Sequence, residues 1–278
     1  MLISGLIGDP VEHSLSPFMH NAAFQALGID ARYDLWHTAA ADLPSRIATL
    51  RIEGILGANV TVPHKGAVIP LLGNVSETAR RIGSVNTVIP RDGQLWGDNT
   101  DAYGFGRALG YVTGGAVPRS ALVVGAGGAS RAVLVSLQEA GVADIRLVNR
   151  TMARAEALAV ELTEPGCPAI VAEPWSRLEE VASSARLVVN ATSIGWHGDE
   201  LPFAAAIIDA LPGDAVVMDL TYRLTAMLRL ASARGLRTAD GLPMLIHQGA
   251  RAFDLWTGRP APIEVMTLAV REAYAARA

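Results

Sequence analysis

Short apolar or β-branched segments alternate with longer helical patterns along almost the whole chain. This alternation is typical of βαβ units and a mainly parallel sheet, so the sequence predicts an α/β fold. We also expect a helix over residues 17–27, with Ser16 as its N-cap and Pro17 at its first position. In the first half, the expected strands are residues 2–7, 31–37, 54–60 and 86–89.

The second half has the order of elements that a nucleotide-binding domain requires. Residues 113–118, Thr-Gly-Gly-Ala-Val-Pro, are rich in breakers and predict a linker. Because 278 residues exceed the usual size of a single core, we expect two domains. Periodicity leaves open whether the last helices fold back onto the first half. The expected strands are 121–124, 145–148, 187–189 and 215–218, and the expected helices are 130–139, 151–162, 243–256 and 263–276.

Composition excludes several classes of function. Lys and Arg total 23 against 27 Asp and Glu, without long runs of one sign, so bulk charge recruits neither nucleic acid nor membrane. We find no secretory signal and no apolar run of membrane-spanning length. Cys167 is the only cysteine, which excludes an internal disulfide and fits a reducing cytoplasm. The prediction is a cytoplasmic monomer or homodimer, with the choice between the two left open.

A glycine-rich turn over residues 123–130, Val-Val-Gly-Ala-Gly-Gly-Ala-Ser, follows an expected strand and opens an expected helix. This context is the one that a dinucleotide fingerprint needs. Gly125 permits the tight turn, and Gly127 lets the backbone approach a pyrophosphate at the helix N-terminus. Ser130 replaces the third glycine of the fingerprint, and it is small enough for close helix packing. The sequence therefore predicts a dinucleotide site here.

The residues after the second strand of this domain indicate which dinucleotide is bound. NAD sites place an acid there to accept from the ribose 2′-hydroxyl, but this chain has Asn149, Arg150 and Arg154. Two guanidinium groups can bind a 2′-phosphate, and Arg150 can also stack on adenine. NADP is therefore favoured over NAD. The alternative is that both arginines merely solvate the start of a helix.

Three dense polar motifs lie in the first half where strands are expected to end. They are residues 59–65, 83–87 and 97–104, which supply amides, hydroxyls and carboxylates. Ligands of open α/β sheets bind outside the carboxyl ends of strands, so these motifs are expected to converge on one cleft. Such a set of groups suits a polyhydroxylated ligand.

The chain closely resembles the shikimate dehydrogenase family from Gly8 to Gly258. Ordered motifs carry this resemblance, namely residues 8–17, 59–65, 97–104, 125–129, 149–151, 190–195, 244–248 and 256–258. The resemblance implies NADP-dependent, reversible reduction of 3-dehydroshikimate to shikimate. It also implies a substrate domain of residues 1–110 that is completed by helices in residues 242–278. A Rossmann-type NADP domain would then span residues 111–241.

The resemblance also assigns roles to individual residues. Lys65 and Asp101 are implied as the catalytic pair, and Ser14 and Ser16 would hold the shikimate carboxylate. Tyr222 would lie near the substrate. The residues implied to bind substrate hydroxyls are Asn59, Thr61, Asn86, Asp101 and Gln248. The residues implied to contact the cofactor are Gly125, Ala126, Gly127, Gly128, Ala129, Asn149, Arg150, Thr151, Arg154, Thr192, Gly241 and Met244.

The chain departs from the family pattern at a few positions. Leu224 stands where relatives usually have proline, and Met227-Leu228 replaces a Thr-Pro pair, which puts the position of Tyr222 in doubt. Gly249 replaces an alanine found in many relatives.

Several other interpretations stay open at this stage. Ser14 and Ser16 could merely cap the helix that follows them, and Thr100 or Asp101 could be an N-cap. His13, His20 and His64 have no metal-ligand spacing and are expected to be structural or loop residues. Relatives acting on quinate or aminoshikimate would share every main motif. A non-catalytic NADP-responsive binding protein of the same fold is the alternative from another class.

Overall fold

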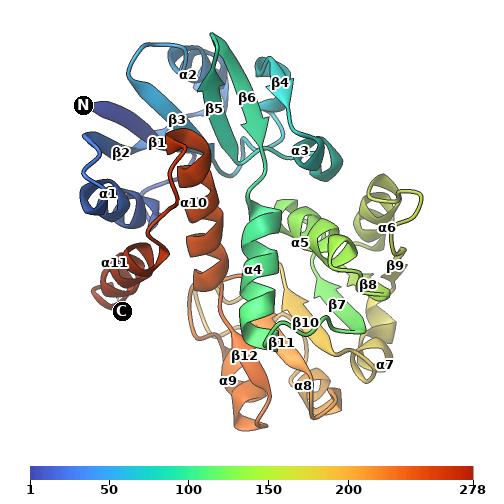
Figure 1. Ribbon diagram of the computed structural model, residues 1–278. Coiled ribbons are helices and arrows are strands. Elements are labelled where there is room, and N and C mark those ends of the chain that lie inside the picture. The colour runs from blue at the N-terminus through green and yellow to red at the C-terminus, as the bar shows by residue number, and fades with distance from the viewer. Residues whose placement is uncertain (278) are drawn as a thin grey trace. The chain divides into compact units, whose positions relative to one another are not determined.

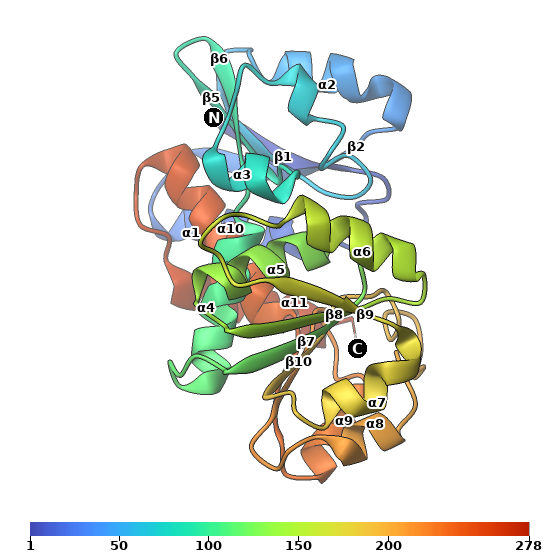
Figure 2. The same cartoon turned by 90° about the vertical axis from the view of Figure 1, so that its right-hand side faces the viewer.

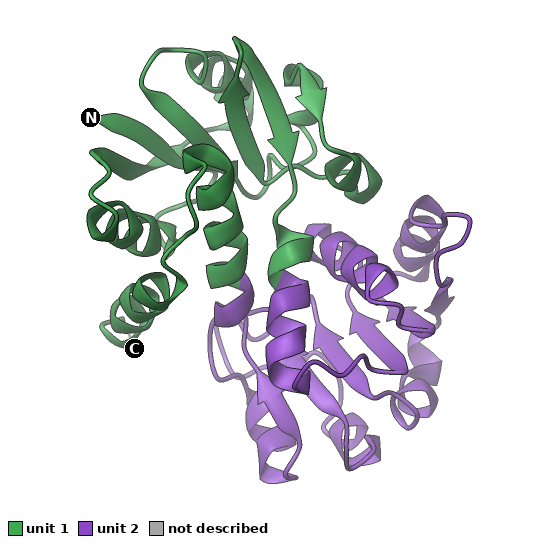
Figure 3. Ribbon diagram, viewed as in Figure 1, with its two compact units in different colours: residues 1–104, 245–278 green, residues 105–244 purple. Residues whose placement is uncertain are grey.

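The structure is a computed structural model that describes residues 1–277. The chain forms two compact units, coloured separately in Figure 3. Unit 1 contains residues 1–104 and the chain from Leu245 onward, and unit 2 contains Phe105–Met244. The divisions fall inside helices α4 (Asp101–Thr113) and α10 (Leu242–Thr257). The domain boundaries at residues 110 and 241 stay predictions.

Unit 1 is built on a six-stranded sheet with the order β2-β1-β3-β5-β6-β4 (Figure 1). Its strands β1, β2 and β3 are parallel, whereas β5 runs antiparallel to both β3 and β6. The strands are β1 (Leu2–Gly8), β2 (Ala31–His37), β3 (Ile55–Val60), β4 (Asn74–Val75), β5 (Thr87–Arg91) and β6 (Gln94–Asp98).

A hairpin that the sequence analysis missed makes this sheet mixed. Asp92 and Gly93 link β5 to β6, with φ angles of 52° and 73°. Two successive residues with positive φ form the tight hairpin turn that an Asp-Gly pair favours. Strand β5 runs opposite to β3, and the hairpin returns β6 to the direction of β3.

Helices cover both faces of the sheet in unit 1. Side chains of α2 (Leu43–Thr49) and α3 (Glu77–Ile82) join the apolar core on one face. On the other face, α10 packs through Trp256, whose indole N–H donates to the Val88 carbonyl at 3.1 Å. A Cβ at Gly57 would lie 2.3 Å from the Trp256 ring, so this close approach requires glycine. Helices α1 (Ser16–Ala26) and α11 (Ile263–Ala275) lie side by side.

The start of α1 corrects one prediction. The helix already includes Ser16, its N-cap is Leu15, and no side chain caps it. The Ser14 hydroxyl instead accepts a hydrogen bond from the Ser16 amide at 3.1 Å. Pro17 lies in the first turn, as expected, because its missing N–H would have no helical partner there.

Unit 2 is a doubly wound domain around a fully parallel sheet with the order β12-β11-β10-β7-β8-β9. Helices α5 and α6 lie on one side of the sheet, and α7, α8 and α9 lie on the other (Figure 2). The strands are β7 (Ser120–Val124), β8 (Asp144–Val148), β9 (Ile170–Glu173), β10 (Leu187–Asn190), β11 (Val216–Asp219) and β12 (Arg237–Ala239). The helices are α5 (Gly128–Glu139), α6 (Met152–Glu161), α7 (Leu178–Ala182), α8 (Ala206–Ala210) and α9 (Ala226–Ala233).

Within the described residues, no helix has both the length and the hydropathy needed to cross a membrane.

An aromatic cluster in the core of unit 1 contains a buried histidine. The His20 ring stacks on Tyr33 with ring centroids 4.4 Å apart, and Phe253 and Trp256 lie beside it. Neither ring nitrogen of His20 has a hydrogen-bond partner among the described residues. Burial lowers the pKa of His20 from 6.5 to about 3, because the charged imidazolium would lose its hydration.

We expect this histidine to make the stability of the fold dependent on pH. The unfolded chain binds a proton at His20 below pH 6.5, whereas the folded chain does so only near pH 3. The contribution of neutral His20 to the free energy of unfolding is therefore fully present above pH 6.5. It falls as pH drops below 6.5, by up to ~1.4 kcal/mol per pH unit. His20→Phe keeps a ring for stacking and should remove this component.

Urea unfolding of wild type and His20→Phe between about pH 7 and about pH 5 measures the effect. The difference in unfolding free energy between the two should change with pH. Exposed His13, changed to Gln, is the control and should leave the slope as in wild type. Equal pH slopes for wild type and His20→Phe would contradict the prediction.

Candidate active site

The topology of unit 1 brings the predicted polar motifs to one edge of its sheet. Strands β1 and β3 are parallel neighbours, so the segments after Gly8 and Val60 leave the sheet side by side. Strand β5 is antiparallel to β3, and therefore Asn86 enters the sheet at this same edge. Strand β6 leaves it at Asp98, just before α4 begins with Asp101. Four segments distant in sequence thus meet at a single place.

Lys65 and Asp101 form an ion pair at this edge. Lys65 Nζ donates to Asp101 Oδ2 at 2.6 Å, and the side chains are only 23% and 11% exposed. Partial burial strengthens the attraction between the charges but also removes water from both of them. The pair therefore needs further hydrogen-bond partners.

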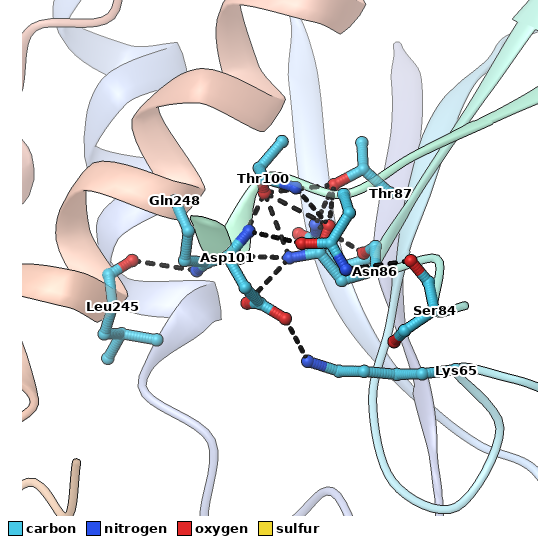
Figure 4. Close-up of polar contacts among 10 residues, drawn as sticks. Lys65, Ser84, Asn86, Thr87, Thr100, Asp101, Leu245 and Gln248 are labelled. Atoms are coloured by element: carbon cyan, nitrogen blue, oxygen red, sulfur yellow. Dashed lines mark hydrogen bonds and ion pairs between the residues drawn. The ribbon is translucent and has the colours of Figure 1, made fainter. Parts of the chain in front are cut away.

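Asn86, which directly precedes β5, supplies such a partner to Asp101. Its side-chain amide lies 2.9 Å from Asp101 Oδ1 and 3.0 Å from Thr100 Oγ1 (Figure 4). Its oxygen accepts from the Thr100 backbone N–H at 2.8 Å. The Asp101 backbone N–H donates to Asn99 Oδ1, which fixes the start of α4. Asp101 is thus held at both its backbone and its carboxylate.

Gln248 brings α10 into the same network. Its Nε2 donates to the Leu245 carbonyl of its own helix at 2.8 Å. Its Oε1 is 3.3 Å from the Asn86 amide nitrogen. This arrangement explains why a residue close to the C-terminus groups with Lys65 and Asp101 (Figure 4).

Asn59 is buried, and its side chain forms hydrogen bonds with other residues of unit 1. Its amide donates to the Asn86 carbonyl and to Thr87 Oγ1, and its oxygen accepts from the Tyr33 hydroxyl at 2.8 Å. Burial raises the pKa of Tyr33 well above its usual value, while a hydrogen bond with Ser16 acts in the opposite direction. The structure therefore connects Asn59 to Ser16 through Tyr33, a link that the sequence did not indicate.

Ser14, Ser16 and Thr61 lie after the carboxyl ends of β1 and β3. Ser16 is buried, whereas Ser14 and Thr61 are half-buried. Their roles as substrate ligands stay predictions.

Unit 2 carries a cavity of about 230 Å³ at the carboxyl edge of its parallel sheet. Its lining follows the ends of β7, β8 and β10, where nucleotides bind in doubly wound folds. Sequence reasoning had not indicated Trp175 and Pro202 as lining residues. The lining is formed by Val124, Gly125, Ala126, Gly127, Asn149, Arg150, Arg154, Trp175, Ala191, Thr192, Ser193, Ile194 and Pro202.

The glycines of this loop are present for different physical reasons. Gly125 has a φ of 109°, and a Cβ there would lie 2.9 Å from Thr192 Cγ2, so the fold itself requires glycine. Cβ atoms on Gly127 or Gly128 would meet nothing within 4 Å. The fold leaves open space at these two positions, which fits the close approach of a pyrophosphate to the backbone.

Ser130 is compatible with the missing third glycine. It is fully buried in the first turn of α5, and its hydroxyl accepts from the Gly127 backbone N–H at 3.2 Å. A small side chain therefore packs against the sheet and also orders the loop.

Two guanidinium groups line the far side of the cavity. Arg150 and Arg154 are exposed, and neither forms an ion pair within the described part of the chain. Asn149 donates to the Thr151 carbonyl at 2.9 Å, which shapes the turn that carries both arginines. The cavity therefore combines open glycine backbone with free positive charge, as an anionic dinucleotide with a 2′-phosphate requires.

A buried polar pair that sequence reasoning missed orders the third wall of this cavity. Asn190 donates to Asp219 Oδ2 at 3.1 Å, and its oxygen accepts from both the backbone N–H and the hydroxyl of Thr192. Burial raises the pKa of Asp219, and its hydrogen bonds with Thr221, Asn190 and Thr225 oppose this. In the sequence, Asn190 begins the motif 190–195, whereas Asp219 is marked only by its place at the end of an apolar strand.

Other predicted cofactor or substrate residues lie outside the cavity lining. A Cβ at Gly241 would lie 2.2 Å from the Leu220 carbonyl, so glycine is required there by packing. The Tyr222 ring meets the edge of Trp196, with centroids 5.1 Å apart, and Met244 is half-buried in α10. Gly128, Ala129 and Thr151 adjoin the lining but do not belong to it. The ligand roles of all these residues stay predictions.

Comparisons with known proteins agree with this geometry. Residues 6–88 match the family described as "Shikimate dehydrogenase substrate binding domain", and residues 113–195 match "Shikimate / quinate 5-dehydrogenase". Residues 241–271 match "Shikimate 5'-dehydrogenase C-terminal domain". The chain is 45% identical over 272 residues to shikimate dehydrogenase (NADP(+)) of Symbiobacterium thermophilum, covering 96% of this chain and 92% of that protein.

Solved structures of similar proteins share the whole fold. Shikimate 5-dehydrogenase of Thermus thermophilus, solved with NADP(H) and shikimate, is 43% identical, with a TM-score of 0.87 over 98% of this chain and 100% of that one. Quinate dehydrogenase of Corynebacterium glutamicum, solved with NAD, is 34% identical, with a TM-score of 0.91 over 98% and 99% of the two chains. By sequence and by fold, this chain belongs to the shikimate dehydrogenase family.

Proposed function

We propose that this protein catalyses the reversible, NADP-dependent reduction of 3-dehydroshikimate to shikimate, a step toward chorismate and the aromatic amino acids. Unit 1 binds the substrate and unit 2 binds NADP. The observation that carries the proposal is the half-buried Lys65–Asp101 pair, which Asn86 holds in place.

The choice of lysine at position 65 supports a role in proton transfer. Lys65 is the only lysine among the 23 basic Lys and Arg residues of the chain. Arginine supplies positive charge everywhere else, but it does not release a proton at ordinary pH. A site that needed charge alone would be served by either residue. A site that must deliver a proton requires lysine.

The residues of the chain account for the chemistry at the substrate. NADPH, when bound, supplies the hydride that reduces the ring carbonyl. Lys65 stabilises the negative charge that develops on the carbonyl oxygen and delivers a proton to it. Asp101 orients the neighbouring hydroxyl of the substrate and keeps the lysine in position. The pair therefore acts as a unit.

Hydroxyl and amide groups around the pair bind the rest of the substrate. Ser14 and Ser16, which follow β1, hold the carboxylate, and Tyr222 contacts the ring. The groups that bind the substrate hydroxyls are Asn59, Thr61, Asn86, Asp101 and Gln248.

Cofactor selectivity follows from Arg150 and Arg154. Both lack an acidic partner among the described residues, so they are available to bind the 2′-phosphate of NADP. Thr192, ordered by Asn190, lines the opposite wall.

A second candidate function is the oxidation of quinate. The fold matches quinate dehydrogenase of Corynebacterium glutamicum with a TM-score of 0.91, and that protein was solved with NAD. The two free arginines of the present chain favour NADP over the NAD of that structure.

The substrate and cofactor pair can be tested directly. Initial rates with shikimate and with quinate, each with NADP+ and with NAD+, should give the highest kcat/KM for shikimate with NADP+. A higher value for quinate with NAD+ would reverse the order of the two candidates. No turnover of either substrate, together with saturable NADP binding, would indicate a non-catalytic binding protein.

Lys65→Ala should lower kcat by about 10²-fold or more while changing the KM for shikimate far less, because its contribution grows as charge develops. Lys65→Arg keeps the positive charge but removes the transferable proton. It should lose nearly as much kcat as Lys65→Ala. Full activity of Lys65→Arg would show that charge alone is required.

The single lysine also allows contact with substrate to be observed without turnover. Lysine labelled with ¹⁵N at Nζ gives one side-chain ammonium position, that of Lys65. Its NMR signal should shift when shikimate saturates the enzyme. An unchanged signal would remove Lys65 from the substrate site.

Replacing Arg150 and Arg154 together by Gln should raise the KM for NADP+ by about 10-fold or more and leave the KM for NAD+ nearly unchanged, because only NADP carries the 2′-phosphate. Exposed Arg51, changed to Gln, is the matched control in unit 1. Equal effects on both cofactors would assign the two arginines a structural role.

A further inference from the structure

A second cavity in unit 2, of about 310 Å³, has no role in the proposed reaction. It lies at the amino edge of the parallel sheet, opposite the edge where the nucleotide cavity is found. Arg119 and Arg186 directly precede β7 and β10, and Arg237 is the first residue of β12. The parallel direction of the strands thus gathers three guanidinium groups around one hollow.

The charge of this cavity is unbalanced. Asp214 is the one acid in its lining, and it pairs with Arg186 at 2.6 Å. Within the described residues, the Arg119 side chain has neither an ion-pair nor a hydrogen-bond partner. Arg237 donates to the Val112 carbonyl at 3.3 Å, which leaves most of its five N–H donors free. Two guanidinium groups therefore face the cavity without an anionic partner.

A buried hydroxyl adds an independent sign of a ligand. Thr113 is 7% exposed, lines the cavity, and its Oγ1 has no hydrogen-bond partner among the described residues. A buried polar atom without a partner is unfavourable unless something else supplies one. Thr113 opens the segment 113–118, which the nucleotide and substrate sites do not use.

We propose that this cavity binds a small organic phosphate monoester. A phosphate dianion matches two free guanidinium groups, which can each bind it through paired N–H donors. A rotation of the covered Thr113 side chain toward the cavity would let its hydroxyl donate to a phosphate oxygen. Val117, Pro118 and Val216 line the rest of the cavity and would contact the organic part of the ligand.

Binding can be measured calorimetrically with inorganic phosphate and with phenyl phosphate. The enzyme is first saturated with NADPH and shikimate, which are both reduced and do not react with each other, so the other two sites are filled. We expect one molecule per chain, with phenyl phosphate binding more tightly because of the apolar lining. The absence of saturable binding by either probe would overturn the proposal.

Substitutions of residues that line the cavity test whether the phosphate binds there. Replacing Arg119 and Arg237 together by Gln should weaken binding by about 10-fold or more, and Thr113→Val should weaken it about 3-fold. Arg51→Gln, in the other unit, is the matched control and should change nothing. Unchanged affinity in the double variant would place any bound phosphate elsewhere.

Asp214→Asn gives a test that loss of folding cannot imitate. It removes the only acid of the cavity and frees Arg186, so phosphate should bind about 3-fold more tightly or better. Weaker or unchanged binding in this variant would overturn the proposed location.

Discussion

The ion pair between Lys65 and Asp101 is the interaction around which unit 1 is arranged. Two charges that are only 23% and 11% exposed lose much of their hydration, and they persist only where other groups complete their hydrogen bonds. Asn86 does this for the carboxylate, which belongs to the first residue of α4 and so lies at the favourable end of the helix dipole. The mixed sheet follows from the same need, because only an antiparallel β5 brings Asn86 to the edge where β3 ends.

The nucleotide cavity of unit 2 depends on glycines that leave the backbone uncovered, whereas the site of unit 1 depends on an ion pair. Gly125 is required by the fold, since any side chain there would collide with Thr192 and the backbone of Ala191. A side chain at Gly127 or Gly128 would meet no such obstacle within the protein. The absence of side chains there is therefore explained by the close approach of the cofactor pyrophosphate to the backbone. Asn190 and Asp219 then hold the facing loop with buried hydrogen bonds, which keeps the cavity open at the carboxyl edge.

The sequence predicted the parts of the fold whose pattern is local. The strands of unit 2 from β7 to β11, apart from β9, are apolar runs next to clear helices, so their periodicity was sufficient. Strands β4, β9 and β12 lie at the edges of the two sheets, and partners elsewhere in the sheet define them more than their own residues do. The hairpin between β5 and β6 could have been found, because Asp92-Gly93 is a strong turn signal.

For the site, too, the sequence predicted individual residues but not the contacts between distant elements. Motifs located Lys65, Asp101 and Asn86, but periodicity could not show that Tyr33 joins Asn59 to Ser16, since this link depends on how β2 packs beside β1. The expected cap at Ser16 was wrong for a related reason. Its hydroxyl is turned toward the buried Tyr33, and Ser14 takes up its backbone N–H instead.

The distribution of basic residues connects the three sites. Arginine lines both the nucleotide cavity and the cavity at the amino edge, where a fixed charge and paired donors suit phosphate groups. Lysine occurs once, beside Asp101, at the only position for which proton transfer is proposed. Every other Lys or Arg position of the chain holds arginine, so composition alone does not account for lysine at position 65. The chemistry of the reaction is therefore a sufficient reason for its presence there.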